Sequence, residues 1–151
     1  MNTVIFLDID GVLNTRNTTD RCCGYIGIED SKVALLAELV SNLEAGIVLT
    51  STWREEWNDE MGQYLRTKLD NYGLVISAMT PMISHRKRCL EVKEWLKTHK
   101  IDKMIILDDM DFGWSDHGLE KYWVETDWYN EGLTADIIDD IIDNKENFNY
   151  K

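Results

Sequence analysis

The sequence predicts an α/β protein built around a parallel β-sheet, and three observations lead to this fold class. Short apolar runs that suit strands alternate along the chain with longer segments whose apolar residues recur at helical spacing. The runs are continuously apolar, which is typical of strands that are covered on both faces of a parallel sheet. No internal repeat or linker divides the 151 residues. We therefore expect one domain over residues 1–151, with right-handed crossovers joining about five strands.

Local patterns place the individual elements. Apolar runs predict strands over residues 4–7, 47–49, 74–76, 104–107 and 122–125. Apolar residues three or four positions apart predict helices over residues 33–43, 57–69, 92–99 and 137–142. Glycines end the first two helices, and residues 29–31 supply acids and a candidate N-cap to the first. Residues 15–27 are polar and are expected to form a loop, or a short flap over the strand ends.

Composition and charge limit the classes of function. An apolar share of 44% is ordinary for a globular protein, and no apolar run reaches the ~18 residues of a membrane span. Three cysteines without metal-type spacing, and no secretory signal, predict reduced thiols and a cytoplasmic location. Sixteen basic and 28 acidic residues give a net charge of −12, which disfavours extended contact with nucleic acid. A phosphorylated small molecule, or the end of a nucleic-acid strand, stays compatible.

The first predicted strand leads directly into two acidic residues. Asp8 is expected at the carboxyl end of the strand, where open α/β sheets bind their ligands, and Asp10 lies one step beyond. Gly11 lets the backbone turn sharply and approach a ligand closely. Two carboxylates so close repel each other unless a cation lies between them or one keeps its proton. The sequence therefore predicts a metal, a proton, or both at this point.

Polar residues also follow the second and fourth predicted strands. These are Thr50 and Ser51 in one case and Asp108 and Asp109 in the other. Because the carboxyl ends of parallel strands meet at one edge of the sheet, these residues are expected near Asp8. Oxygen ligands without cysteine or histidine favour Mg²⁺ over zinc or copper. A cation from residues 86–88 could neutralise the charge that develops on a phosphate group.

These residue types predict a phosphoryl-transfer centre. Asp8 would attack phosphorus and form an aspartyl-phosphate. Asp10 would protonate the leaving oxygen and then deprotonate the water that hydrolyses the intermediate. Hydroxyls of Thr50 and Ser51 can donate hydrogen bonds to phosphate oxygens. This division of roles removes the repulsion, because Asp10 keeps a proton while Asp8 is ionised.

The motifs resemble those of the haloacid dehalogenase (HAD) superfamily of phosphatases. The resemblance rests on residues 8–12, the strand ending at residues 50–51, a cation that opens a later helix, and residues 108–109. More narrowly, the chain resembles the HAD domains of Swiss Army Knife RNA-repair proteins, in residues 49–54, 88–96, 107–109 and 132–134. The resemblance extends over nearly the whole chain. It implies a Rossmann-like, three-layer α/β/α fold with a minimal cap or none.

The resemblance also implies roles for the acidic residues. Asp8 becomes the nucleophile and Asp10 the general acid and base. The Mg²⁺ ion would be held by Asp8, by Asp108 and Asp109, and by the backbone carbonyl of Asp10. An enzyme without a cap would accept the exposed phosphate of a larger substrate, or would take a lid from a partner.

The resemblance implies two contacts to the phosphate group, and for each of them two neighbouring residues are candidates. Thr50 or its neighbour Ser51 holds the phosphate group. The third motif is usually a lysine, and the register of the residues that follow selects Arg88 here, with Lys87 directly beside it. An arginine would bind phosphate as a fork where lysine acts as a point charge.

Two residues after the second strand have both a structural and a functional interpretation. Trp53 either covers the end of the strand or stacks on a base of the substrate. Arg54 could form an ion pair with an anionic group of the substrate.

The sequence thus predicts a Mg²⁺-dependent phosphatase that acts on a nucleotide or a nucleic-acid end phosphate, the substrate resting mainly on the resemblance. One alternative is a receiver-type signalling domain, which usually has its acidic pair after the first strand and a Lys-Pro near the end. Here the pair Asp108 and Asp109 comes late, and no Lys-Pro occurs. The other alternative is a HAD-shaped binding or regulatory protein without activity, although each motif position keeps a usable residue.

Overall fold

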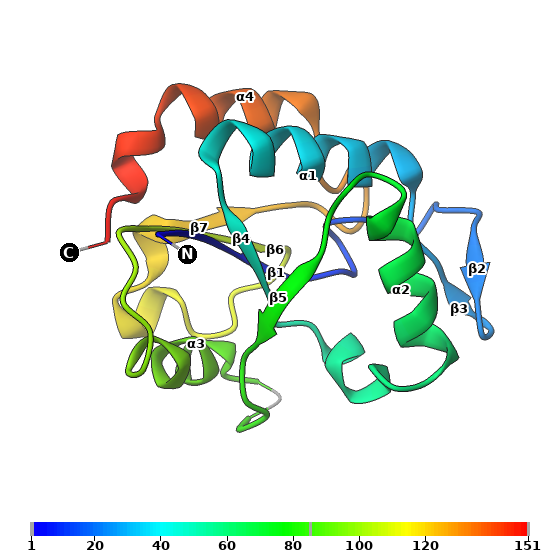
Figure 1. The fold of residues 1–151 in the computed structure, drawn as a ribbon, viewed down its shortest axis with the longest axis horizontal. Coiled ribbons are helices and arrows are strands. Elements are labelled where there is room, and N and C mark those ends of the chain that lie inside the picture. The colour runs from blue at the N-terminus through cyan, green and yellow to red at the C-terminus, as the bar shows by residue number, and fades with distance from the viewer. Residues whose placement is uncertain (1, 85, 151) are drawn as a thin grey trace.

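A five-stranded parallel sheet forms the centre of the molecule (Figure 1). The computed structural model describes residues 2–84 and 86–150. In this sheet β1 (Thr3–Leu7) is the central strand. The strand order is β5-β4-β1-β6-β7, with β4 (Gly46–Leu49), β5 (Ile76–Met79), β6 (Lys103–Asp108) and β7 (Trp123–Glu125). Every pair of neighbouring strands is parallel, which confirms the predicted α/β fold class.

The burial of β1 explains its continuous apolar run. Each of its residues is buried, because helices cover both faces of the sheet. Ile5 and Leu7 belong to the core on one face, and Val4 and Phe6 to the core on the other. The alternation follows from the pleat of a strand, in which successive side chains point to opposite faces.

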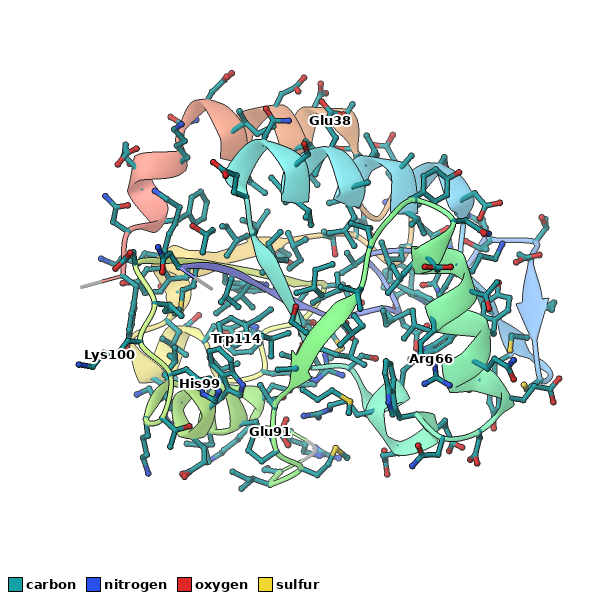
Figure 2. The ribbon with its side chains drawn as sticks, in the orientation of Figure 1. Glu38, Arg66, Glu91, His99, Lys100 and Trp114 are labelled. Atoms are coloured by element: carbon teal, nitrogen blue, oxygen red, sulfur yellow. The ribbon has the colours of Figure 1, made fainter. Side chains whose placement is uncertain are left out.

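Helices form the two outer layers. The larger core contains buried residues of α1 (Asp30–Leu43), α2 (Glu60–Asp70) and α4 (Ala135–Asp143). The smaller core lies against α3 (Arg88–Leu96) on the opposite face. Figure 1 shows α1 and α4 side by side over one face of the sheet and α3 beneath the other. Trp114 is fully buried on the α3 side of the sheet (Figure 2). The predicted three-layer arrangement is therefore confirmed.

Several predicted boundaries differ from the structure. The third strand covers Ile76–Met79 where residues 74–76 were expected. Leu74 is buried in the core before the strand begins, and Val75 is exposed, so their apolar character does not mark the strand. This strand lies at the edge of the sheet and alternates in burial, unlike the central strands. A 3-10 helix, Thr52–Glu56, precedes α2, which starts three residues later than predicted.

The predicted flap contains a short hairpin. Strands β2 (Arg21–Cys22) and β3 (Tyr25–Ile26) pair antiparallel within residues 15–27. The hairpin lies beside α2 in Figure 1, and the hydroxyl of Tyr64 on α2 accepts a hydrogen bond from the backbone N–H of Ile28. In the described part of the chain this hairpin is the only added sheet, which agrees with a minimal cap.

Within residues 2–84 and 86–150, no helix combines the length and the apolar character that crossing a membrane would require.

Candidate active site

The register of the sheet brings the predicted acidic residues together. Leu7 lies opposite both Leu49 and Leu107, so the residues that follow these three form one row at the carboxyl edge. Asp8 and Asp108 are neighbours in that row. By the alternation of the strand they point to the same face as the Phe6 core, which is the face covered by α3.

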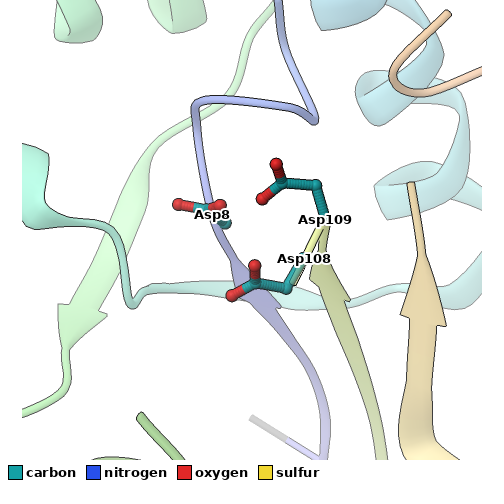
Figure 3. A group of neighbouring side chains, drawn as sticks. All are labelled: Asp8, Asp108 and Asp109. Carbon is teal, nitrogen blue, oxygen red and sulfur yellow. The ribbon is translucent and has the colours of Figure 1, made fainter. Parts of the chain in front are cut away.

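Three carboxylates form a compact group at this edge. Figure 3 shows Asp8, Asp108 and Asp109 pointing toward one another from the ends of β1 and β6, and one oxygen of each lies within 4.8 Å of the others. Asp8 and Asp108 are buried, and Asp109 is partly buried. Gly11 has φ +88°, and a Cβ atom there would overlap the Asp109 carboxylate. The backbone after β1 thus closes over the group, and the three oxygen donors fit a Mg²⁺ ion.

Electrostatic strain accompanies this arrangement. Burial, followed by the negative charge of Asp8, raises the pKa of Asp109 to about 6. The same two causes raise the pKa of Asp108 well above its ordinary value, although Arg88 opposes the shift. Buried carboxylates that face each other favour a proton or a cation between them. A divalent cation would relieve this repulsion.

The arginine predicted for the third motif lies against two of these acids. Arg88 is the first residue of α3, and its Nη1 lies 3.0 Å from an Asp8 oxygen and 2.8 Å from an Asp108 oxygen. Burial alone would lower the pKa of Arg88, but the charges of Asp8 and Asp108 outweigh burial and raise it. Lys87, the alternative, is exposed and lies at the N-cap of α3. The structure therefore places Arg88, and not Lys87, between the carboxylates.

The side chain of Asp10 is held apart from the carboxylate group. Its two oxygens accept hydrogen bonds from Asn14 Nδ2 at 2.9 Å and Trp53 Nε1 at 3.3 Å. Burial raises the pKa of Asp10, the Asn14 hydrogen bond opposes this, and the charge of Asp8 adds to it. A carboxyl with a raised pKa, three residues beyond the end of β1, suits a general acid.

Asn14 contacts the candidate site, and the sequence alone did not predict this contact. It is fully buried, and besides binding Asp10 it accepts the backbone N–H of Gly11 and donates to the carbonyl of Gly27. These bonds join the turn after β1 to the end of the flap. The signal in the sequence that could have indicated Asn14 is a polar side chain four residues after Asp10, directly after two apolar residues.

The two hydroxyls after β4 have different surroundings. The Ser51 hydroxyl accepts the backbone N–H of Trp53 and caps the 3-10 helix. The Thr50 hydroxyl is buried and has no hydrogen-bond partner among the described residues. A buried hydroxyl without a partner is rare in folded proteins, so a ligand atom at this place would satisfy it.

Arg54 forms its ion pair with Glu91 and not with the three clustered carboxylates, and its predicted role in substrate binding stays a prediction. Its guanidinium is buried, lies 3.0 Å from a Glu91 oxygen, and donates to the carbonyl of Thr80 at 2.9 Å. The other Glu91 oxygen accepts the backbone N–H groups of Ile83 and Ser84. Arg54 and Glu91 therefore connect the ends of β4 and β5 to α3, the helix that carries Arg88 (Figure 2 labels Glu91).

A cavity of about 1320 Å³ opens in front of the carboxylates. Asp8, Asp10, Arg88 and Asp109 line it, and so does Trp53, whose side chain is otherwise buried. Its remaining walls come mainly from the hairpin β2–β3, from Met110 and Phe112, and from the chain between the end of β7 and the start of α4. The predicted nucleophile, acid and arginine therefore share one accessible space.

This combination of fold and site defines the class of protein: an α/β domain whose parallel sheet ends in clustered carboxylates and an arginine. The model of one family, described as the HAD domain in Swiss Army Knife RNA repair proteins, matches residues 4–138. The chain therefore belongs to this family, which confirms the predicted HAD fold and removes the receiver-type alternative. Neither a search of the curated proteins nor a search of the solved structures gives a match.

Proposed function

We propose that the protein is a Mg²⁺-dependent phosphatase that hydrolyses phosphomonoesters through an aspartyl-phosphate on Asp8. The single observation that carries the proposal is the position of Asp8, which shares Arg88 with Asp108 and faces the cavity together with Asp10. A nucleophile, a separate proton donor and a fixed cation are the groups that this reaction requires.

The first half of the reaction uses Asp8 and Asp10. A carboxylate oxygen of Asp8 attacks phosphorus, and the bond between phosphorus and the leaving oxygen breaks. The proton of Asp10 passes to that oxygen, with Asn14 and Trp53 holding the carboxyl in place. Arg88 and the Thr50 hydroxyl bind phosphate oxygens as negative charge develops on them.

The second half returns the enzyme to its starting state. Asp10, now ionised, takes a proton from water while the water oxygen attacks phosphorus. The bond between phosphorus and Asp8 breaks, and inorganic phosphate leaves. Asp8, Asp108 and Asp109 would hold Mg²⁺, which supplies charge neutralisation for the phosphate group and for the carboxylates themselves.

We propose a nucleotide or a nucleic-acid end phosphate as the substrate. Support comes from the matched family, whose description names RNA repair proteins. The net charge of −12 opposes extended contact with a polyanion and favours recognition of a single terminal phosphate.

Release of phosphate tests the proposed function. The assay compares an aryl phosphate, a panel of nucleotides, and oligonucleotides phosphorylated at the 3′ or 5′ end, each with Mg²⁺ and with EDTA. We expect Mg²⁺-dependent release that Asp8→Asn abolishes, while Asp139→Asn, an exposed change on α4, has no effect. No release from any substrate would favour the HAD-shaped protein without activity, and equal release by Asp8→Asn would overturn the mechanism through an aspartyl-phosphate.

A further inference from the structure

The cavity in front of Asp8 carries an excess of negative charge. Among the described residues, six acidic side chains and two arginines line it, and one of these arginines is Arg88, which is already paired with Asp8 and Asp108. The acidic residues are Asp8, Asp10, Asp109, Glu125, Asp127 and Glu131. Bound Mg²⁺ and a proton on Asp10 would balance the inner acids but not the outer ones.

The outer acids belong to one segment of the chain. Glu125, Asp127 and Glu131 lie at the end of β7 and in the connection to α4, and all three are exposed. Among the described residues, none of them forms an ion pair. Hydrogen bonds from the Asn130 side chain and then the Tyr129 backbone lower the pKa of Asp127. This carboxylate therefore stays charged throughout the neutral range.

Apolar and aromatic surface lies beside these charges. Tyr25 on the hairpin is 65% exposed, and Trp128 in the segment after β7 is partly buried, and both line the cavity. Met110 and Phe112 add apolar surface after β6. Planar, uncharged groups such as nucleobases gain stacking energy against such rings.

Thr126 adds an unsatisfied polar group to the same wall. Thr126 is buried and lines the cavity, and its hydroxyl has no hydrogen-bond partner among the described residues. A neutral hydroxyl or amide of a ligand could satisfy it. The wall therefore offers stacking and neutral hydrogen bonding, and its net charge repels anions.

We infer that the cavity selects phosphomonoesters whose remaining part is uncharged and carries a planar ring, as in a nucleoside, and disfavours substrates that carry a further phosphate group. This inference rests on the proposed function and narrows its substrate class. A second phosphate group bound in the same cavity would face the outer acids, and at low ionic strength the Debye length, roughly 30 Å at 0.01 M, exceeds the width of the cavity. Their repulsion is therefore incompletely screened.

The binding test uses the Asp8→Asn protein with Mg²⁺, so that turnover does not interfere. A nucleoside monophosphate and the corresponding 3′,5′-bisphosphate are titrated at low and at physiological ionic strength, with tryptophan fluorescence as the readout. We expect the monophosphate to bind about tenfold more tightly at low ionic strength, and the difference to shrink as salt screens the repulsion.

Two triple variants with the same loss of charge identify the cause of the difference in affinity between the monophosphate and the bisphosphate. Glu125→Gln, Asp127→Asn and Glu131→Gln together, in the Asp8→Asn background, should bring the bisphosphate close to the monophosphate. The matched control changes three exposed acids on the α1 and α4 surface, namely Glu38→Gln, Asp139→Asn and Asp143→Asn, and should keep the difference. Equal change in both variants would assign the effect to net charge and overturn the inference.

Two further outcomes separate the inference from the proposed function. Equal or tighter binding of the bisphosphate, with affinity that falls as salt rises, overturns the inference whether or not the wild-type protein turns over. Failure of the wild-type protein to release phosphate, together with preferential binding of the monophosphate, overturns the proposed function and supports the inference.

Discussion

The buried ion pair of Arg54 and Glu91 gives a quantitative test of how the site is held. Their side chains are 5% and 2% exposed, and Nη2 of Arg54 lies 3.0 Å from Oε1 of Glu91. Glu91→Gln keeps the shape of the side chain but leaves the charge of Arg54 buried without a counter-ion. Breaking a buried pair in this way costs about 3–5 kcal/mol. We expect about 3 kcal/mol, because glutamine still accepts a hydrogen bond from the backbone N–H of Ile83 or Ser84.

Urea denaturation measures this loss in the free energy of unfolding. With a slope of about 2 kcal/mol per M, the midpoint should fall by about 1.5 M. The control is Glu94→Gln on the same helix, because Glu94 pairs with Lys97 at 3.0 Å but both side chains are exposed. An exposed pair of this kind contributes about 0.5 kcal/mol. Equal midpoints for Glu91→Gln and Glu94→Gln would refute the reasoning.

A double variant separates charge burial from packing. Arg54→Met with Glu91→Leu removes both charges from the interior, so that neither partner is left unpaired. It should be more stable than Glu91→Gln alone. The ion pair also joins α3 to the sheet, and Arg88 lies one turn before Glu91 on that helix. Loss of kcat in the double variant, with folding retained, would show that the pair positions Arg88.

Three further predictions concern the carboxylate group. Arg88→Met removes the cation shared by two carboxylates, so kcat for phosphate release should fall by about a hundredfold or more, and Arg88→Lys should restore part of it. Gly11→Ala should lower the affinity for Mg²⁺ in calorimetry because its Cβ would overlap Asp109, whereas Gly24→Ala, at a similar positive φ but in open space, should not. In EDTA, the pKa of about 6 for Asp109, against an ordinary 3.8, means that the folded state keeps a proton that the unfolded chain has released. The free energy of unfolding should therefore decrease as the pH rises from about 4 to 6, and Asp109→Asn should make this decrease smaller in denaturation curves. Asp10 and Asp108, whose pKa values are also raised, contribute the remainder.

Local pattern was sufficient for most of the fold. The continuous apolar run of β1 and the helical spacing in α1 and α4 each reflect burial that the periodicity of the element itself imposes. The prediction for β5 was displaced because an edge strand is buried on fewer sides, so apolar residues before it, such as Leu74, gave a stronger signal than the strand. Edge strands carry less hydrophobic information than central ones.

The sequence by itself determined which residues could carry the chemistry, because Asp8, Asp10 and the pair at 108–109 follow strands in a pattern that parallel pairing must bring together. Only the tertiary structure decided between neighbours. Arg88 differs from Lys87 in its burial and in its ion pairs with acids far away in the chain. The hydroxyl of Thr50 differs from that of Ser51 in having no hydrogen-bond partner among the described residues, whereas Ser51 accepts the backbone N–H of Trp53. Such contacts depend on how helices and loops pack, and no local periodicity encodes them. The same holds for Arg54, whose charge suited a phosphate in sequence, and whose burial against Glu91 gave it a structural partner.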